Sequence, residues 1–123
     1  MNTLELFDIS TVSAASELVI LTMPITDKTK QPYGILHGGI SAMFAETAAS
    51  IGANAALTEP GRVAVGVDLQ IHHLNAATSG QLQAKATPLH IGNRIQTWQV
   101  AITEVNAAKD IAFATVTLAS HSL

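Results

Sequence analysis

Residues 37–57, HGGISAMFAETAASIGANAAL, decide the fold. The stretch contains no proline and is dominated by alanine, the strongest helix former, so it predicts one long helix. At about 100° per residue, one face of this helix is bulky and the opposite face is small. The bulky face carries Ile40, Met43, Phe44, Thr47, Ala48, Ile51 and Ala55, and the small face carries Ala42, Ala45, Ala49, Gly52, Ala53 and Ala56. Because a helix that is apolar all round is usually buried, we expect little of it to face water.

The segments around this helix have strand character. Residues 17–25 (ELVILTMPI) predict a first strand, whereas residues 8–16 are polar and predict irregular structure. After a turn at residues 58–62, four further strands are expected, at residues 63–74, 80–89, 94–104 and 111–120. One strand, one helix and a run of strands joined by short turns indicate an α+β fold, an antiparallel sheet with one helix against it. We expect a single domain over residues 1–123.

The composition limits the partners of this chain. Charged residues make up 12% of the 123 residues, about half of the roughly 25% typical of soluble domains. So little charge cannot cover the whole surface, and we therefore expect a homo-oligomer. The net charge of -3 without a basic cluster argues against nucleic acid, and the longest apolar stretch is too interrupted to cross a membrane. The absence of cysteine excludes disulfides and thiolate chemistry and fits a cytoplasmic location.

Glu46 is the only charged residue on the predicted helix, with Ser50 one turn further on. Burying an ionised carboxylate without a partner costs several kcal/mol, and no lysine or arginine lies in the helix to pair with it. Two interpretations follow. Either the helix is exposed along this line and Glu46 is merely solvated, or Glu46 lies in a cleft where its charge has a chemical use.

The start of the helix, His37-Gly38-Gly39, predicts a second chemical group. Free N–H groups at a helix N-terminus can stabilise a developing oxyanion, and glycine lets a substrate carbonyl approach closely. At 1.5 Å rise per residue, however, Gly38 and Glu46 are about 12 Å apart along the axis. Two antiparallel copies of the helix would bring Glu46 of one subunit near Gly38 of the other. This geometry predicts a site shared across a dimer.

The stretch QPYGILHGGISAMFAETAAS, residues 31–50, resembles the core motif of hotdog-fold acyl-CoA thioesterases. The resemblance is to the group of 4-hydroxybenzoyl-CoA thioesterase (the Arthrobacter type), 1,4-dihydroxy-2-naphthoyl-CoA thioesterase and the phenylacetate-pathway enzymes. Residues 65–73 and 87–99 also resemble strands of these proteins. The resemblance implies a hotdog fold, with the antiparallel sheet wrapped around the central helix. The region before the first strand is short in this chain, so we expect the leading helix of many hotdog proteins to be reduced here.

The resemblance also implies a role for each residue of the motif. Glu46 would act as nucleophile or general base, and the Gly38 N–H would bind the thioester carbonyl oxygen. Gln31 and His37 would orient that carbonyl and the glycine loop, and Ser50 would help to position water or Glu46. No cofactor is implied, since coenzyme A is part of the substrate, and the assembly would be a dimer or a tetramer built from dimers.

The remaining candidates are substrate contacts. Met43, Phe44 and His73 are expected near the acyl pocket. His90 and Arg94 occupy a turn that contacts coenzyme A in relatives, although Asn93 displaces the arginine by one position. No metal site is expected, because His72 and His73 point to opposite faces of one strand with Asp68 the only nearby acid.

Three functions are compatible with these observations. The first is hydrolysis of an aryl- or medium-chain acyl-CoA, which the spacing between Gln31 and His37-Gly38-Gly39 favours. The second is a hotdog dehydratase or hydratase, which usually pairs a histidine with an acid. The third is a module that binds acyl-CoA without turnover, for which loss of the acid would be typical.

Overall fold

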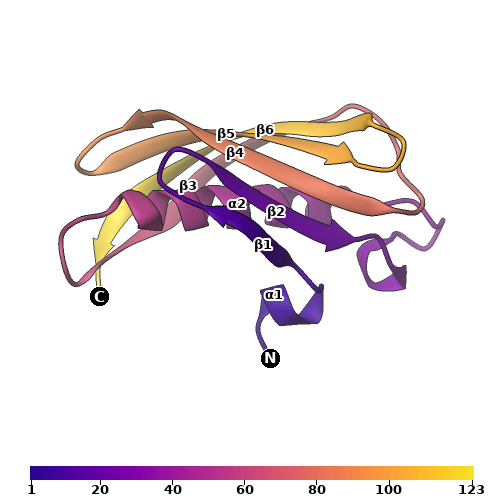
Figure 1. Cartoon of the computed structure of the whole chain (residues 1–123), viewed down its shortest axis with the longest axis horizontal. Coiled ribbons are helices and arrows are strands. Elements are labelled where there is room, and N and C mark those ends of the chain that lie inside the picture. The colour runs from indigo at the N-terminus through magenta and orange to yellow at the C-terminus, as the bar shows by residue number, and fades with distance from the viewer.

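A computed structural model describes all residues, 1–123, and shows one antiparallel sheet curved over one long helix (Figure 1). In chain order, the elements are α1 (Thr3–Leu6), β1 (Ser10–Ala14), β2 (Val19–Pro24), the 3-10 helix η1 (Asp27–Thr29), α2 (Gly38–Ala56), β3 (Arg62–His73), β4 (Gln81–Ile91), β5 (Ile95–Glu104) and β6 (Lys109–Ser122). The predicted α+β class, the long helix and the five predicted strands are confirmed.

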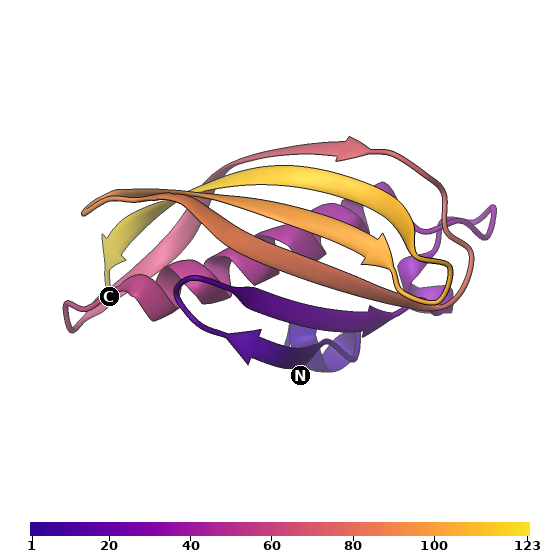
Figure 2. The same ribbon diagram turned by 45° about the horizontal axis from the view of Figure 1, so that its top comes forward.

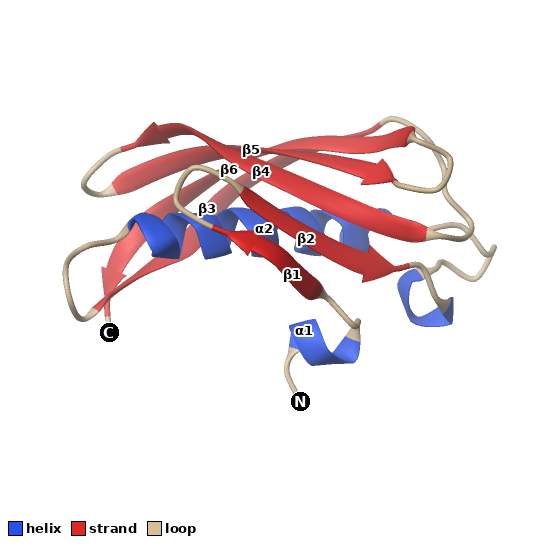
Figure 3. Cartoon of the chain, in the orientation of Figure 1, coloured by secondary structure: helices blue, strands red, loops and turns tan.

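The six strands form a single sheet in the order β1-β2-β4-β5-β6-β3, with every neighbouring pair antiparallel. The strands curve over α2 as one layer, so that the helix lies against the inner face of the sheet (Figures 2 and 3). The two edges are β1 and β3. Each edge strand leaves one row of backbone N–H and C=O groups unpaired within the chain.

The core lies between α2 and the sheet. Alternate residues of β2 and β5 point inward, as the two-residue period of a strand requires. Trp98 is fully buried and its ring packs against Gly52 of α2, where even a methyl group would overlap the ring. The Trp98 Nε1–H donates to Gln96 Oε1 (2.9 Å), and Gln96 Nε2 donates to the Ala53 carbonyl (3.0 Å). These contacts fix the C-terminal half of α2 on the sheet.

Two predictions about the fold are wrong. Residues 8–16 are not irregular, because β1 pairs with β2 over residues 10–14. The serine and threonine residues of this exposed edge strand lack the apolar alternation that marks a strand. The helix is also not buried all round. Its buried residues are Ser41, Phe44, Ala45, Ala48, Ala49, Gly52 and Ala53, whereas Ile40, Met43, Thr47 and Ile51 are half-buried.

The small residues of α2 explain which side faces the sheet. Alanine and glycine let the sheet approach the helix backbone closely, while the sheet of one chain covers only one side of the helix. The opposite side, with its bulkier residues, stays open. The leading helix is short, as expected, because α1 has only four residues. None of the helices has both the length and the apolar character needed to cross a membrane.

Candidate active site

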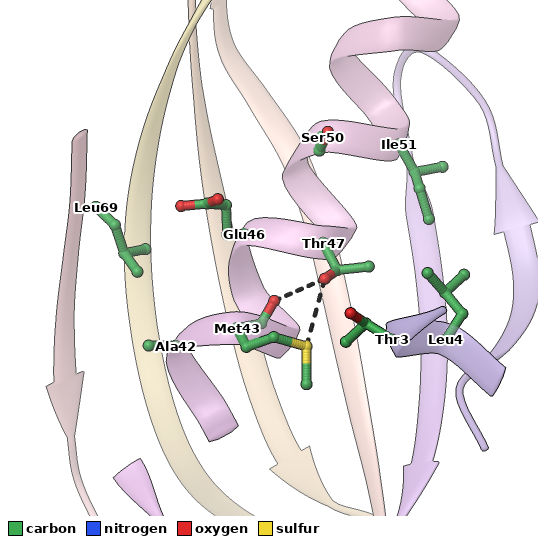
Figure 4. A pocket seen from close by; sticks show the side chains of 9 residues that line it. All are labelled: Thr3, Leu4, Ala42, Met43, Glu46, Thr47, Ser50, Ile51 and Leu69. Atoms are coloured by element: carbon green, nitrogen blue, oxygen red, sulfur yellow. Dashed lines mark hydrogen bonds between the residues drawn. The ribbon is translucent and has the colours of Figure 1, made fainter. Parts of the chain in front are cut away.

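Glu46 projects from the middle of α2 toward β3, an edge strand of the sheet, and its side chain is exposed. It lines a cavity of about 520 Å³. Figure 4 shows Glu46 pointing toward Leu69 of β3, with Thr3 and Leu4 of α1 on the other side, beside Thr47 and Ile51. The lining comprises Thr3, Leu4, Ala42, Met43, Glu46, Thr47, Ser50, Ile51 and Leu69. The predicted residues Glu46, Ser50 and Met43 therefore do share one cavity.

The surroundings of Glu46 leave its carboxylate unengaged. The side-chain hydrogen bonds of the helix interior are made by neighbours instead, since the Thr47 hydroxyl donates to the Met43 carbonyl (2.7 Å) and Asn54 donates to the Ser50 carbonyl (2.8 Å). A free carboxylate beside an apolar wall can attack a carbonyl carbon or accept a proton from water.

His37 caps the start of α2. Its side-chain Nδ1 accepts the Gly39 N–H (2.8 Å), and its carbonyl accepts the N–H groups of Ile40 (3.0 Å) and Ser41 (3.2 Å). Because Nδ1 is an acceptor here, the ring proton of neutral His37 lies on Nε2. The Gly38 N–H donates to no group of the chain. His37 thus holds the first turn so that one N–H at the positive end of the helix dipole stays free.

Gln31, Gly38 and His73 line a second cavity, of about 190 Å³. The ring of His73 lies over Gly38, where a β-carbon would come within 3.0 Å of His73 Nε2. Gln31 stands at the start of a tight turn in which its N–H donates to the Ile35 carbonyl (2.7 Å) and Gly34 has a φ of 84°. Glycine takes this conformation at no steric cost.

The predicted catalytic residues thus fall into two groups within one chain. The first cavity holds Glu46 and Ser50, and the second holds Gln31 and Gly38. The two cavities have no lining residue in common. This division agrees with the separation of about 12 Å that the helical rise gives between Gly38 and Glu46.

Three candidates lie elsewhere. His90 and Arg94 are exposed around the turn between β4 and β5, and neither lines the Glu46 cavity. The tip of this turn, Gly92-Asn93, lines a separate cavity with Leu57 and Thr58, at the C-terminal end of α2. Phe44 is fully buried on the sheet side of α2, so the expectation that it lines an acyl pocket is wrong. Phe44 and Met43 are adjacent in sequence, and adjacent helical positions face different sides.

The prediction missed several residues of the Glu46 cavity. Thr47 and Ile51 follow Met43 at intervals of four, so helical spacing could have identified them. Leu69 on β3 and Thr3 and Leu4 on α1 carried no such signal, because only the tertiary structure brings these elements to the helix. The structure has no group of three histidine or acidic side chains that could hold a metal ion.

Comparison with known proteins identifies the family. The family model of the thioesterase superfamily matches residues 33–108. The chain belongs to the thioesterase superfamily. The matched segment, more than half of the chain, contains α2 with Glu46 and Gly38 as well as β3 with His73.

Individual relatives and solved structures support this assignment to the thioesterase superfamily. The chain is 37% identical to the 1,4-dihydroxy-2-naphthoyl-CoA hydrolase of Listeria monocytogenes, over 81% of this chain and 80% of that protein. A Haemophilus influenzae relative is 45% identical over 69% of this chain, although the match spans only 62% of that longer protein. The crystal structure of a Haemophilus influenzae thioesterase superposes with a TM-score of 0.91 at 34% identity, covering 99% of this chain and 84% of that one. The predicted hotdog fold is therefore confirmed.

Proposed function

We propose that this protein hydrolyses an acyl-CoA thioester, with an aryl or medium-chain acyl group, to the free acid and coenzyme A. Glu46 acts as nucleophile or general base, and the Gly38 N–H binds the carbonyl oxygen. The observation that carries the proposal is a pair of features: a free N–H at the start of α2 and an unengaged carboxylate on the same helix, beside an apolar cavity.

These two groups meet the needs of thioester hydrolysis. As an oxygen nucleophile adds to the thioester carbon, negative charge develops on the carbonyl oxygen, and a well-placed donor stabilises it by about 3–4 kcal/mol. The C–S bond then breaks and coenzyme A leaves as thiolate, which takes up the proton released from water. If Glu46 attacks directly, the intermediate is an acyl anhydride that water hydrolyses. If Glu46 is a general base, water attacks the thioester itself.

The active site is proposed to form between two copies of the chain. Gly38 and Glu46 line different cavities of one subunit, so two antiparallel α2 helices are needed to bring them to one carbonyl. β3 supports this arrangement because it is a 12-residue edge strand, with Val65 and Val67 exposed by 41% and 58%. Pairing of two such edges would satisfy their backbone groups and cover these side chains. We propose a homodimer, alone or as half of a tetramer.

The acyl group would occupy the cavity beside Glu46. Met43, Ile51, Leu69 and Leu4 provide its apolar walls. A cavity of this kind accepts hydrocarbon better than a charged group. The Listeria monocytogenes relative is named as a hydrolase of 1,4-dihydroxy-2-naphthoyl-CoA, which supports an aryl substrate. His73 would contact the substrate near Gly38, because its ring lies over that glycine.

The test is release of free thiol from benzoyl-CoA, phenylacetyl-CoA and hexanoyl-CoA by the wild type and by Glu46→Gln. We expect the substitution to lower kcat by about 10²–10⁴-fold, the usual contribution of a catalytic acid or base. The matched control is Glu17→Gln, an exposed glutamate between β1 and β2, which should leave the rate unchanged. Binding of all three compounds without thiol release would contradict the proposal and favour a binding module. Hydration of an unsaturated acyl-CoA without thiol release would favour a hydratase.

A further inference from the structure

The carboxylate of Glu46 lies directly against the backbone of β3 at Gly66. A β-carbon placed on Gly66 would lie 2.8 Å from the carboxyl carbon of Glu46 and 3.0 Å from each of its oxygens. Ordinary van der Waals contact for such a carbon begins at about 3.5 Å. The position that Glu46 occupies therefore exists only because residue 66 has no side chain.

The conformation of the backbone does not by itself require glycine at this position. Gly34, Gly61 and Gly80 have positive φ angles, but Gly66 does not. A glycine inside a strand weakens the strand and often marks a close approach by another group. We therefore attribute Gly66 to the space that it leaves for the Glu46 carboxylate.

β3 is irregular at the same point. Gly66 pairs with Leu118 and Asp68 pairs with the next residue of β6, Thr117, so that Val67 has no partner. Such a bulge bends the strand and is often found beside an active site, where it redirects a side chain. The bulge and the glycine together shape the segment of β3 that faces the middle of α2.

We propose that Gly66 is a positioning residue, which sets where the Glu46 carboxylate stands relative to the thioester. This inference rests on the proposed catalytic role of Glu46. No hydrogen bond within the chain holds the carboxylate, and the hydrogen bonds nearby on α2 are made by Thr47 and Asn54. The contact with β3 at Gly66 therefore limits which rotamers Glu46 can adopt.

A methyl group at residue 66 would consequently affect turnover rather than folding. The group that it meets is the free end of a flexible side chain, which can rotate away at little cost. The fold loses nothing, and alanine is a better strand residue than glycine. The carboxylate, however, would have to move by at least about 0.7 Å, the difference between 2.8 Å and ordinary contact at about 3.5 Å. A misplacement of about 1 Å can cost about 10²-fold in rate.

The experiment compares Gly66→Ala with the wild type in kcat, KM and thermal unfolding. We expect kcat to fall by about 10²-fold, with KM and the melting temperature close to those of the wild type. Thr117→Ala, on β6 opposite the bulge, is the control for a disturbance of the β3–β6 pairing and should retain the wild-type kcat. A normal kcat in Gly66→Ala, or a loss that is matched by Thr117→Ala, would overturn the proposal.

A double mutant separates positioning from a general disturbance of β3. Glu46→Asp shortens the side chain by one methylene and withdraws the carboxylate from residue 66. In that background the loss caused by Gly66→Ala should shrink from about 10²-fold to about a few-fold, because the two changes act on one contact. Equal losses in both backgrounds would overturn the proposal.

Crystal structures of Gly66→Ala and the wild type provide a readout that does not depend on activity. The Glu46 carboxylate should be displaced from β3 while α2 and the sheet stay in place, and an unmoved carboxylate would overturn the proposal.

Different results would refute the proposed function of Glu46 and the proposed role of Gly66. A fully active Glu46→Gln would refute the proposed function, whereas an inactive Glu46→Gln together with a fully active Gly66→Ala would refute only the role of Gly66.

Discussion

Two glutamates of this chain each lie against a glycine, yet their surroundings are opposite. Glu46 is exposed and faces Gly66, and the helix around it makes no hydrogen bond to its carboxylate. Glu104 at the end of β5 is 5% exposed and faces Gly80, with its carboxyl carbon 2.7 Å from where a β-carbon of that glycine would lie. A glutamate beside a glycine therefore occurs twice in this chain. The carboxylate of Glu46 is exposed and makes no hydrogen bond, whereas that of Glu104 is buried and fixed.

Glu104 is fixed by three backbone groups. Its carboxylate accepts the N–H groups of Gln81 (2.9 Å), Ala107 (2.8 Å) and Asn106 (3.1 Å). These hydrogen bonds favour the charged form, so the pKa of Glu104 lies below its ordinary value of 4.5 although burial opposes this shift. They join the start of β4 to the turn between β5 and β6. The comparison indicates that a carboxylate whose two oxygens both accept hydrogen bonds stabilises structure, while one that accepts none is available for chemistry.

The largest effect on stability is expected from Gly80→Ala. Gly80 has a φ of 105°, which a residue with a side chain rarely adopts, and the added methyl group would collide with the fixed Glu104 carboxylate. Backbone strain of this kind alone costs about 1–3 kcal/mol. Urea unfolding should therefore show a clear loss for Gly80→Ala and none for Gly66→Ala.

Gly61→Ala is the matched control for backbone strain. Gly61 also has a positive φ, of 76°, but no atom lies within 4 Å of where its β-carbon would be. Gly80→Ala should therefore destabilise the protein more than Gly61→Ala. If Gly66→Ala were as destabilising as Gly80→Ala, the contrast between the two glutamates would be lost.

A smaller effect is expected from pH. Because the folded-state pKa of Glu104 is lowered, its charged form contributes stability that is fully present above pH 4.5 and is lost as the pH falls through the lowered value. Glu104→Gln removes this contribution, since an amide cannot accept all three N–H groups. The free energy of unfolding of the wild type should exceed that of Glu104→Gln at pH 7, and the difference should shrink below pH 4.5. Parallel pH curves for the two proteins would contradict this assignment.

The smallest effect is expected at Leu4, on the Glu46 side of the molecule. Leu4 of α1 closes one side of the cavity that Glu46 lines, and Leu4→Ala would enlarge it. One missing methylene group in a closed apolar pocket changes specificity by about 10-fold or more. Leu4 is only half-buried, so its truncation should have a smaller effect. We expect the ratio of kcat/KM for a longer over a shorter acyl-CoA to rise a few-fold. An unchanged ratio would show that the acyl group does not reach α1.

Much of the fold could be predicted from local patterns. Alanine content and the absence of proline predicted α2 within one residue at each end. Strand-forming residues between turn signals, with clear alternation in β5, predicted five of the six strands. The strand that was missed, β1, has serine and threonine residues at an exposed edge, where burial imposes no alternation. The expectation that α2 is buried all round was wrong for a related reason. Periodicity identifies two faces but does not say which one the sheet covers.

The candidate site divides in the same way. The sequence by itself determined that Glu46 is the one acid of α2, that His37 and Gly38 begin the helix, and that these groups lie too far apart to meet within one chain. Those conclusions need only residue order and helical rise. The tertiary structure decided that Gly66 faces Glu46, that Gly80 faces Glu104 and that α1 borders the cavity. Each of these contacts depends on strand register, a bulge or the docking of a separate element, and such long-range packing leaves no periodic signal in the sequence.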